Sequence, residues 1–128
     1  MTTAVRQRPK HLNLFKIKQP LPAIVSILHR VSGAALFLLF IPLGLCALQD
    51  SLRSSEDFSR WAGILANPIA KLILIGFIWA YMHHFCAGIR YLLLDLHKGI
   101  TLEAARLSSK IVLGVSLVLT LLIATKIW

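Results

Sequence analysis

Two adjacent histidines, His83 and His84, lie deep in an uncharged run of the chain, within the segment YMHHFCAGIRYLLLD. The next charged residue, Arg90, comes six residues after His84, a distance of roughly 9 Å along a helix axis. Ionisable side chains at such a depth usually face a bundle interior, a cavity or a cofactor. The neutral imidazole has a ring nitrogen that can bind iron, so haem ligation is one chemistry that these residues could perform.

Helical geometry places the two histidines on different faces. At about 100° per residue, one narrow stripe consists of Tyr81, His84, Gly88, Tyr91 and Asp95, and the neighbouring stripe of His83, Ala87, Arg90 and His97. Gly88 lies one turn from His84, and its missing side chain leaves room for a flat ring system or for another helix backbone. Two interpretations remain open here. Either His84 is an axial haem ligand, or both histidines hydrogen-bond across helices beside a packing notch.

A second polar group stands at the start of the first uncharged run, in the segment SILHRVSG. Ser26, His29 and Arg30 are spaced i, i+3 and i+4, so they share one helical face, which Gly33 continues. A lone arginine here would be explained as an interfacial anchor, because its long side chain reaches the headgroups at little cost. A hydroxyl, an imidazole and a guanidinium together can instead hydrogen-bond a carbonyl that gains negative charge, as a quinone does on reduction.

Membrane-spanning helices must position these groups. The 128 residues are 57% hydrophobic and 15% charged, and the mean hydropathy is +0.75, well above that of a soluble domain. Uncharged runs cover residues 31–48, 72–89 and 111–125, and a bilayer core needs about twenty helical residues. Lys110 and Lys126 can extend to the interface and lengthen the short third run. Isolated strands would leave backbone groups unpaired in lipid, so we expect an all-α membrane protein with three transmembrane helices.

Local signals set the expected boundaries of these helices. We expect a cytoplasmic segment at residues 1–22 and a transmembrane domain at residues 23–128, with helices at about 23–50, 67–97 and 101–127. Pro42 interrupts the first run and predicts a kink near residues 38–42. The serine-rich segment QDSLRSSEDFSRWAG predicts a polar loop, in which Trp61 suits an interfacial anchor.

Two helix starts have favourable capping residues. Asn67 is a good cap for the second helix, and Pro68 suits its first helical position. Thr101 is the expected cap of the third helix, and Glu103 lies in its first turn at the positive end of the helix dipole. These signals fix where the second and third helices begin.

Basic residues indicate the orientation in the membrane. Ten of the fourteen Lys and Arg residues lie in the segment up to Arg30 or in the connection between the second and third helices. We therefore expect a cytoplasmic N-terminus and a periplasmic C-terminus, in a bacterial inner membrane because no signal or transit peptide is evident. The net charge of +9 also attracts anionic lipid, whereas nothing in the pattern suggests nucleic acid. Cys46 and Cys86 differ too much in expected depth to form a disulfide.

Two stretches of the chain resemble a known family. The segment RPKHLNLFKIKQPLPAIVSILHRVSG, together with HFCAGIRYLLLD, closely resembles the larger cytochrome b membrane subunits of bacterial succinate dehydrogenase, or respiratory complex II. The resemblance covers essentially the whole chain. It implies an enzyme subunit without a complete active site of its own, in a heteromeric bundle. A flavoprotein and an iron-sulfur subunit would supply electrons, and a second small membrane subunit would help to bind haem b and ubiquinone.

The resemblance also implies roles for particular residues. His84, in the family pattern His-x-x-x-Gly-Ile-Arg that includes Gly88, would be one axial ligand of the haem iron, and the second ligand would come from the other membrane subunit. Ser26 and Arg30 match the quinone-binding residues, and His29 and Arg30 lie where the haem propionates are contacted. Asp95 matches an acidic residue implied to assist proton delivery. Tyr91 departs from the family, which often has histidine there, so no role is carried over to that position.

Two alternatives use the same sequence features. The chain could anchor a fumarate reductase, which runs the reverse reaction on the same scaffold. It could also be a non-catalytic membrane scaffold protein, in which His83 and His84 serve only helix packing. The first alternative would use a low-potential quinone, and the second predicts neither haem nor an effect on quinone.

Overall fold

Every regular element in the described part of the chain, residue 13 and residues 16–128, is a helix in the computed structural model. Most of the expected cytoplasmic segment, residues 1–12 and 14–15, lies outside the described residues. The elements are α1 (Leu21–Ala35), the π-helix η1 (Leu36–Phe40), α2 (Ile41–Ser51), α3 (Ser55–Ala66), α4 (Pro68–Asp95) and α5 (Leu102–Ile127). Three stretches are long and apolar enough to span a bilayer, namely Leu21–Ser51, Pro68–Asp95 and Leu102–Ile127. The expected all-α fold with three transmembrane helices is confirmed.

The first span is interrupted just before Pro42. There the backbone N–H of Ile41 donates to the carbonyl of Leu36, five residues back, and η1 separates α1 from α2. Proline has no N–H to donate and its ring crowds the carbonyl four residues earlier, so the wider π-turn relieves the conflict. The irregularity expected around Pro42 thus takes the form of a π-helix.

The segment between the first two spans is a helix, so the prediction of a polar loop there was wrong. Ser54 caps α3, because its side chain accepts a hydrogen bond from the N–H of Asp57 at 3.0 Å. Glu56 and Asp57 lie in the first turn, where the helix dipole favours negative charge. The Ser-x-x-Asp spacing is a capping signature, and it outweighs the abundance of serine. Trp61 is half-buried on α3 and lines a hollow against α2.

The predicted starts of α4 and α5 are confirmed. The side chain of Asn67 accepts from the N–H of Ile69 at 2.8 Å, and Thr101 accepts from the N–H of Ala104 at 3.3 Å. At its other end α4 stops at Asp95. Two residues later, His97 adopts a left-handed conformation with φ of 58°. The N–H of Lys98 then donates to the carbonyl of Leu93 at 2.9 Å, which closes the helix as a Schellman motif.

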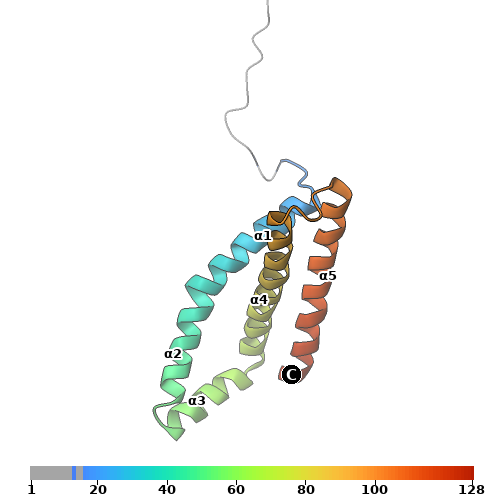
Figure 1. Ribbon diagram of the computed structural model, residues 1–128. Coiled ribbons are helices and arrows are strands. Elements are labelled where there is room, and N and C mark those ends of the chain that lie inside the picture. The colour runs from blue at the N-terminus through green and yellow to red at the C-terminus, as the bar shows by residue number, and fades with distance from the viewer. Residues whose placement is uncertain (1–12, 14–15) are drawn as a thin grey trace, which may run out of the picture.

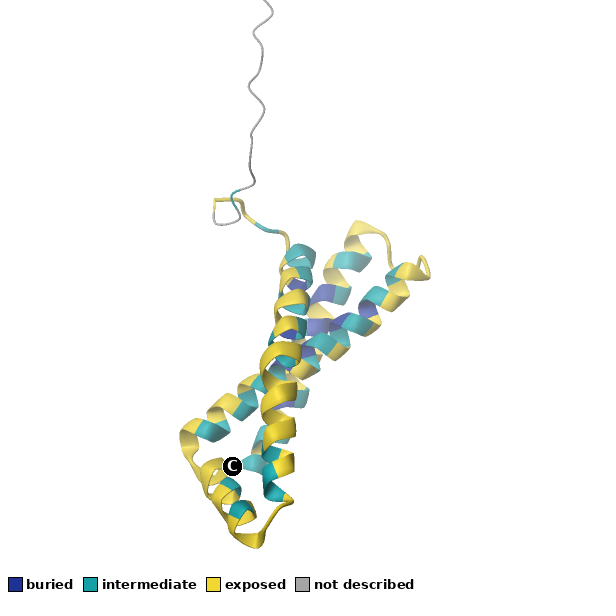
Figure 2. Ribbon diagram, turned by 90° about the vertical axis from the view of Figure 1, so that its left-hand side faces the viewer, coloured by how far each residue is buried: buried dark blue, intermediate teal, exposed yellow. Residues whose placement is uncertain are grey.

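The helix α4 lies between α1 and α5, and both pack against it (Figure 1). The start of α1, the end of α4 and the start of α5 come together at one end of the molecule. Buried residues gather toward that end, as Figure 2 shows. The helix α2 leans away from the centre, and among the described elements it contacts only η1 and α3.

The interior of this bundle is small and partly polar. Its apolar core consists of Val25, Ala87 and Val112, one residue from each of α1, α4 and α5. Three buried hydroxyl residues of α5 face the same interior and donate to carbonyls of their own helix: Ser109, Ser116 and Thr120. Small and hydroxyl side chains let helices approach closely in lipid, where apolar burial gives no net driving force. Most large apolar side chains are exposed on the outer faces and suit contact with lipid or with other membrane subunits.

Candidate functional site

His84 projects from α4 toward α1 and is fixed there by the backbone of that helix. Its Nδ1 lies 3.0 Å from the carbonyl oxygen of His29 and 3.3 Å from Oγ of Ser32. A carbonyl only accepts hydrogen bonds, so Nδ1 must be the protonated nitrogen. In the neutral ring, Nε2 then keeps its lone pair. This is the tautomer that metal-binding histidines adopt when a carbonyl orients the ring through its other nitrogen.

Three aromatic rings from α1 and α4 meet around this contact. The rings of His29 and His84 are stacked, with centroids 4.1 Å apart and an interplanar angle of 11°. The ring of Tyr91 lies 5.0 Å from that of His29. Ser32 is buried, and its hydroxyl donates to the carbonyl of His29 at 3.0 Å. The carbonyl therefore receives hydrogen bonds from two sides, which holds both the histidine ring and the α1 turn in place.

Two glycines make room for these rings. A methyl group added at Gly33 would lie only 2.8 Å from Cε1 of His84, so no other residue fits without displacing the ring. Gly88 faces His29 instead, at an ordinary contact distance of 3.9 Å from Nε2. Gly88 was predicted to open the space beside His84, but the glycine that lies against this ring is Gly33. The sequence contains a signal for this role of Gly33, because it follows His29 by four residues and so lies on the same helical face.

Substitution of Gly33 by alanine is expected to destabilise the packing of α1 against α4. Overpacking of this kind costs about 1–3 kcal/mol in free energy of unfolding, because either the His84 ring or the α1 backbone must move. Thermal denaturation of the purified protein, followed by circular dichroism, measures the change. Gly44→Ala in the same span is the matched control, since an added methyl group there meets nothing within 4 Å. Equal stability of the two variants would contradict the close contact.

Ser26 and Arg30 flank His29 on α1. Ser26 is half-buried and Arg30 is exposed, and within the described part of the chain neither side chain forms a hydrogen bond or an ion pair. Asp95 is exposed at the last residue of α4, and no cation of the described residues pairs with it. Their polar atoms therefore remain available to a ligand or to another subunit.

His83 occupies a different environment from its neighbour. It is fully buried and stacks on Trp79, with ring centroids 5.4 Å apart. Neither of its ring nitrogens has a hydrogen-bond partner among the described residues. His84, by contrast, is only half-buried. A large planar cofactor approaching from outside the chain can therefore reach His84 but not His83.

Arg90 points to the side of α4 that faces α5. Its Nε donates to Oγ of Ser108 at 2.9 Å, and its Cζ lies 5.3 Å from the centroid of the Tyr91 ring. The predicted stripe of His83, Ala87 and Arg90 lies on the buried side of α4. The structure pairs Arg90 with α5 rather than with Ser26 or Arg30. The two cysteines, Cys46 and Cys86, are both free thiols.

Comparisons with known proteins show the family to which this chain belongs. A family profile described as "Succinate dehydrogenase/Fumarate reductase transmembrane subunit" matches residues 4–123. Three relatives are each named succinate dehydrogenase cytochrome b556 subunit. The relative from Coxiella burnetii is 36% identical over 95% of this chain and 98% of its own length. That from Paracoccus denitrificans is 33% identical over 88% and 84%, and that from Rickettsia prowazekii is 29% identical over 91% and 90%. The chain therefore belongs to the family of succinate dehydrogenase and fumarate reductase transmembrane subunits.

Proposed function

We propose that this chain is the membrane-anchor subunit of a succinate:ubiquinone oxidoreductase and that it binds haem b through His84 and ubiquinone through Ser26 and Arg30. The observation that supports this most directly is the contact between His84 and the His29 carbonyl. It fixes Nδ1 as the protonated nitrogen and leaves Nε2 for iron. The names of the three relatives reported above, each a succinate dehydrogenase cytochrome b556 subunit, support the same assignment.

The residues present fit an axial ligand of haem. The His84 ring is oriented by a backbone carbonyl and is half-buried, and in its neutral form Nε2 carries the lone pair. Bound haem would supply a one-electron carrier. A second ligand of the iron would come from the other small membrane subunit. His29 and Arg30 would contact the propionates, Gly88 would leave space for the His29 ring, and Ser32 would position His84 through the shared carbonyl.

Ubiquinone is the substrate in this proposal. Oxidation of succinate to fumarate by the flavoprotein subunit releases two electrons and two protons, and the iron-sulfur subunit passes the electrons on one at a time. Reduction of ubiquinone to the quinol takes up two electrons and two protons. Arg30 would stabilise the negative charge that develops on the quinone oxygen, and Ser26 would donate a hydrogen bond to it. Asp95, exposed at the same end of the molecule, would assist proton delivery.

The charge pattern supports a location and an orientation for the chain. The start of α1 and the connection between α4 and α5 lie at the same end of the bundle (Figure 1). Ten of the fourteen Lys and Arg residues lie in the stretches of sequence around these two places, residues 6–30 and 90–110. This end would face the cytoplasm of a bacterium and bind the iron-sulfur subunit, with the C-terminus of the chain at the periplasmic face. The family description also includes fumarate reductase. The names of the three relatives favour succinate oxidation as the direction.

Replacing Ser26 with alanine tests the quinone site. We expect ubiquinone reduction by succinate to fall about two- to tenfold, because one neutral hydrogen bond is worth about 0.5–1.5 kcal/mol. Succinate oxidation with an artificial acceptor, which takes electrons from the soluble subunits, should stay unchanged. Both activities are measured on the same purified complex. Ser108→Ala on α5 removes a hydroxyl that bonds Arg90 and serves as a control, since its quinone activity should remain close to that of the wild type. Parallel losses of both activities in Ser26→Ala would argue against a quinone-binding role.

A further inference from the structure

A cavity lies between α4 and α5, at the end where the two helices are joined. Its volume is about 300 Å³. Apolar side chains of both helices form its walls, among them Ile89, Leu93, Ile111 and Val112. Arg90 and Lys98 are the two charged residues that line it. Arg90 follows His84 by six residues, which turns it about 120° around the helix from that histidine, so this cavity lies on another face than the stacked rings.

Arg90 lacks a counter-ion in the described part of the chain. Its side chain is only 6% exposed, yet no carboxylate of the described residues lies within 4.0 Å of it. One of its five N–H groups donates to Ser108, and the guanidinium also contacts the Tyr91 ring. A buried cation is normally paired with an anion, because removing a charge from water is costly. The cavity therefore needs negative charge that the described residues do not supply.

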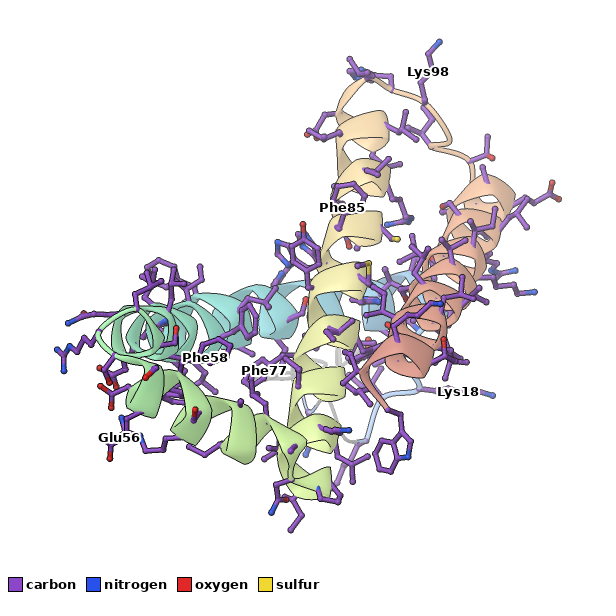
Figure 3. The ribbon with its side chains drawn as sticks, turned by 90° about the horizontal axis from the view of Figure 1, so that it is seen from below. Lys18, Glu56, Phe58, Phe77, Phe85 and Lys98 are labelled. Atoms are coloured by element: carbon purple, nitrogen blue, oxygen red, sulfur yellow. The ribbon has the colours of Figure 1, made fainter. Side chains whose placement is uncertain are left out.

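Lys98 adds a second cation at the mouth of the same cavity. It stands between His97 and Gly99, which have φ angles of 58° and 72°, and its own N–H is bonded to the carbonyl of Leu93. The turn therefore has a fixed backbone, and Figure 3 shows Lys98 on this connection between α4 and α5. Two cations thus lie at the end of the helices, and the apolar walls continue from them toward the middle of the membrane.

We propose that this cavity binds an anionic phospholipid, with its phosphate between Arg90 and Lys98 and an acyl chain along the apolar walls. The ligand must combine negative charge with a long apolar part, and it must arrive from the bilayer, since Ile89, Leu93 and Ile111 are exposed on the outer surface. Basic pockets between transmembrane helices are suited to anionic headgroups for this reason. A free anion would leave the apolar walls uncovered. The site does not depend on haem or quinone, so its test is independent of the function proposed above.

Lipid content of the purified complex tests the site. The complex is isolated through this chain in a mild detergent, and the retained phospholipids are counted by mass spectrometry. Lys98→Gln should lower retained anionic phospholipid about fivefold, since one basic residue near an anionic headgroup is worth about that factor, while zwitterionic lipid stays unchanged. Lys110→Gln is the matched control, because this exposed lysine lies outside the cavity lining. Equal retention in the two variants would overturn the proposal.

A second measurement identifies the source of the negative charge. Wild-type complex is stripped of lipid, and dioleoylphosphatidylglycerol, dioleoylphosphatidylcholine or inorganic phosphate is added back. The half-life of the assembled complex at raised temperature is then measured for each addition. We expect the phosphatidylglycerol to lengthen the half-life at least threefold more than the other two, and Lys98→Gln to reduce this gain. Equal protection by phosphatidylcholine, or by phosphate alone, would overturn the assignment. A carboxylate of another subunit found paired with Arg90 would overturn it as well.

Discussion

Replacement of His84 by alanine is expected to abolish the b-type haem absorbance of the complex purified through this chain. The imidazole is the side chain that the proposal places on iron, and its Nε2 remains free because Nδ1 bonds the His29 carbonyl at 3.0 Å. Loss of an outer partner of a metal ligand already lowers affinity about 10–100-fold, so removal of the ligand itself should lower the affinity for haem by at least that factor. The reduced-minus-oxidised spectrum, with haem quantified per complex, measures the change.

The neighbouring histidine provides the control. His83→Phe keeps an aromatic ring against Trp79 and removes two nitrogens that have no partner among the described residues, so the haem spectrum should survive. Loss of haem in His83→Phe but not in His84→Ala would move the ligand to His83. An unchanged spectrum in both variants, redox behaviour included, would favour a scaffold without haem. The two substitutions are adjacent in sequence, so general damage to α4 would affect both.

Features that depend on local sequence were predictable. The three spans follow from uncharged runs of sufficient length, and the caps at Asn67 and Thr101 follow from residue type and position. The interruption before Pro42 follows from the missing N–H of proline, although its form as a π-helix does not. At α3 the frequent serines suggested a loop, and this prediction was wrong. The Ser54 and Asp57 pair that starts this helix is a local signal in the sequence as well.

Contacts between helices could not be predicted from the sequence. Periodicity placed His29 and His84 on defined faces of their own helices, but it does not give the axial register of one helix against another. The stacking of these two rings depends on that register, as does the bond from His84 to the carbonyl of His29. The roles of Ser32 and Gly33 depend on this register too. The sequence alone does not tell whether a serine or a glycine in a membrane helix faces lipid or a histidine of another helix. The partner of Arg90 could not be predicted for the same reason, since Ser108 lies on α5.

Replacement of Arg30 by alanine is expected to lower ubiquinone reduction on the order of a hundredfold while succinate oxidation with an artificial acceptor is retained. Loss of one donor to a developing oxyanion typically costs 10²–10³ in rate, and Arg30 would be the charged donor of this site. Its side chain forms no ion pair within the described part of the chain. The defect should therefore appear in catalysis rather than in stability. Steady-state assays over a range of quinone concentrations separate kcat from KM.

Arg30 is also placed near the haem propionates in the proposal, so the two roles must be distinguished. If the guanidinium acts mainly on quinone, Arg30→Ala keeps full haem content, and Arg30→Lys recovers part of the rate because charge is restored without the planar fork of donors. Arg106→Ala removes another exposed arginine, in the first turns of α5, and should leave both activities intact. Haem lost in proportion to quinone reduction would show that Arg30 acts through the haem site. A specific donor is effective only where it can reach the quinone oxygen. An equal loss of quinone reduction in Arg106→Ala would therefore show that only the positive charge of this membrane face matters.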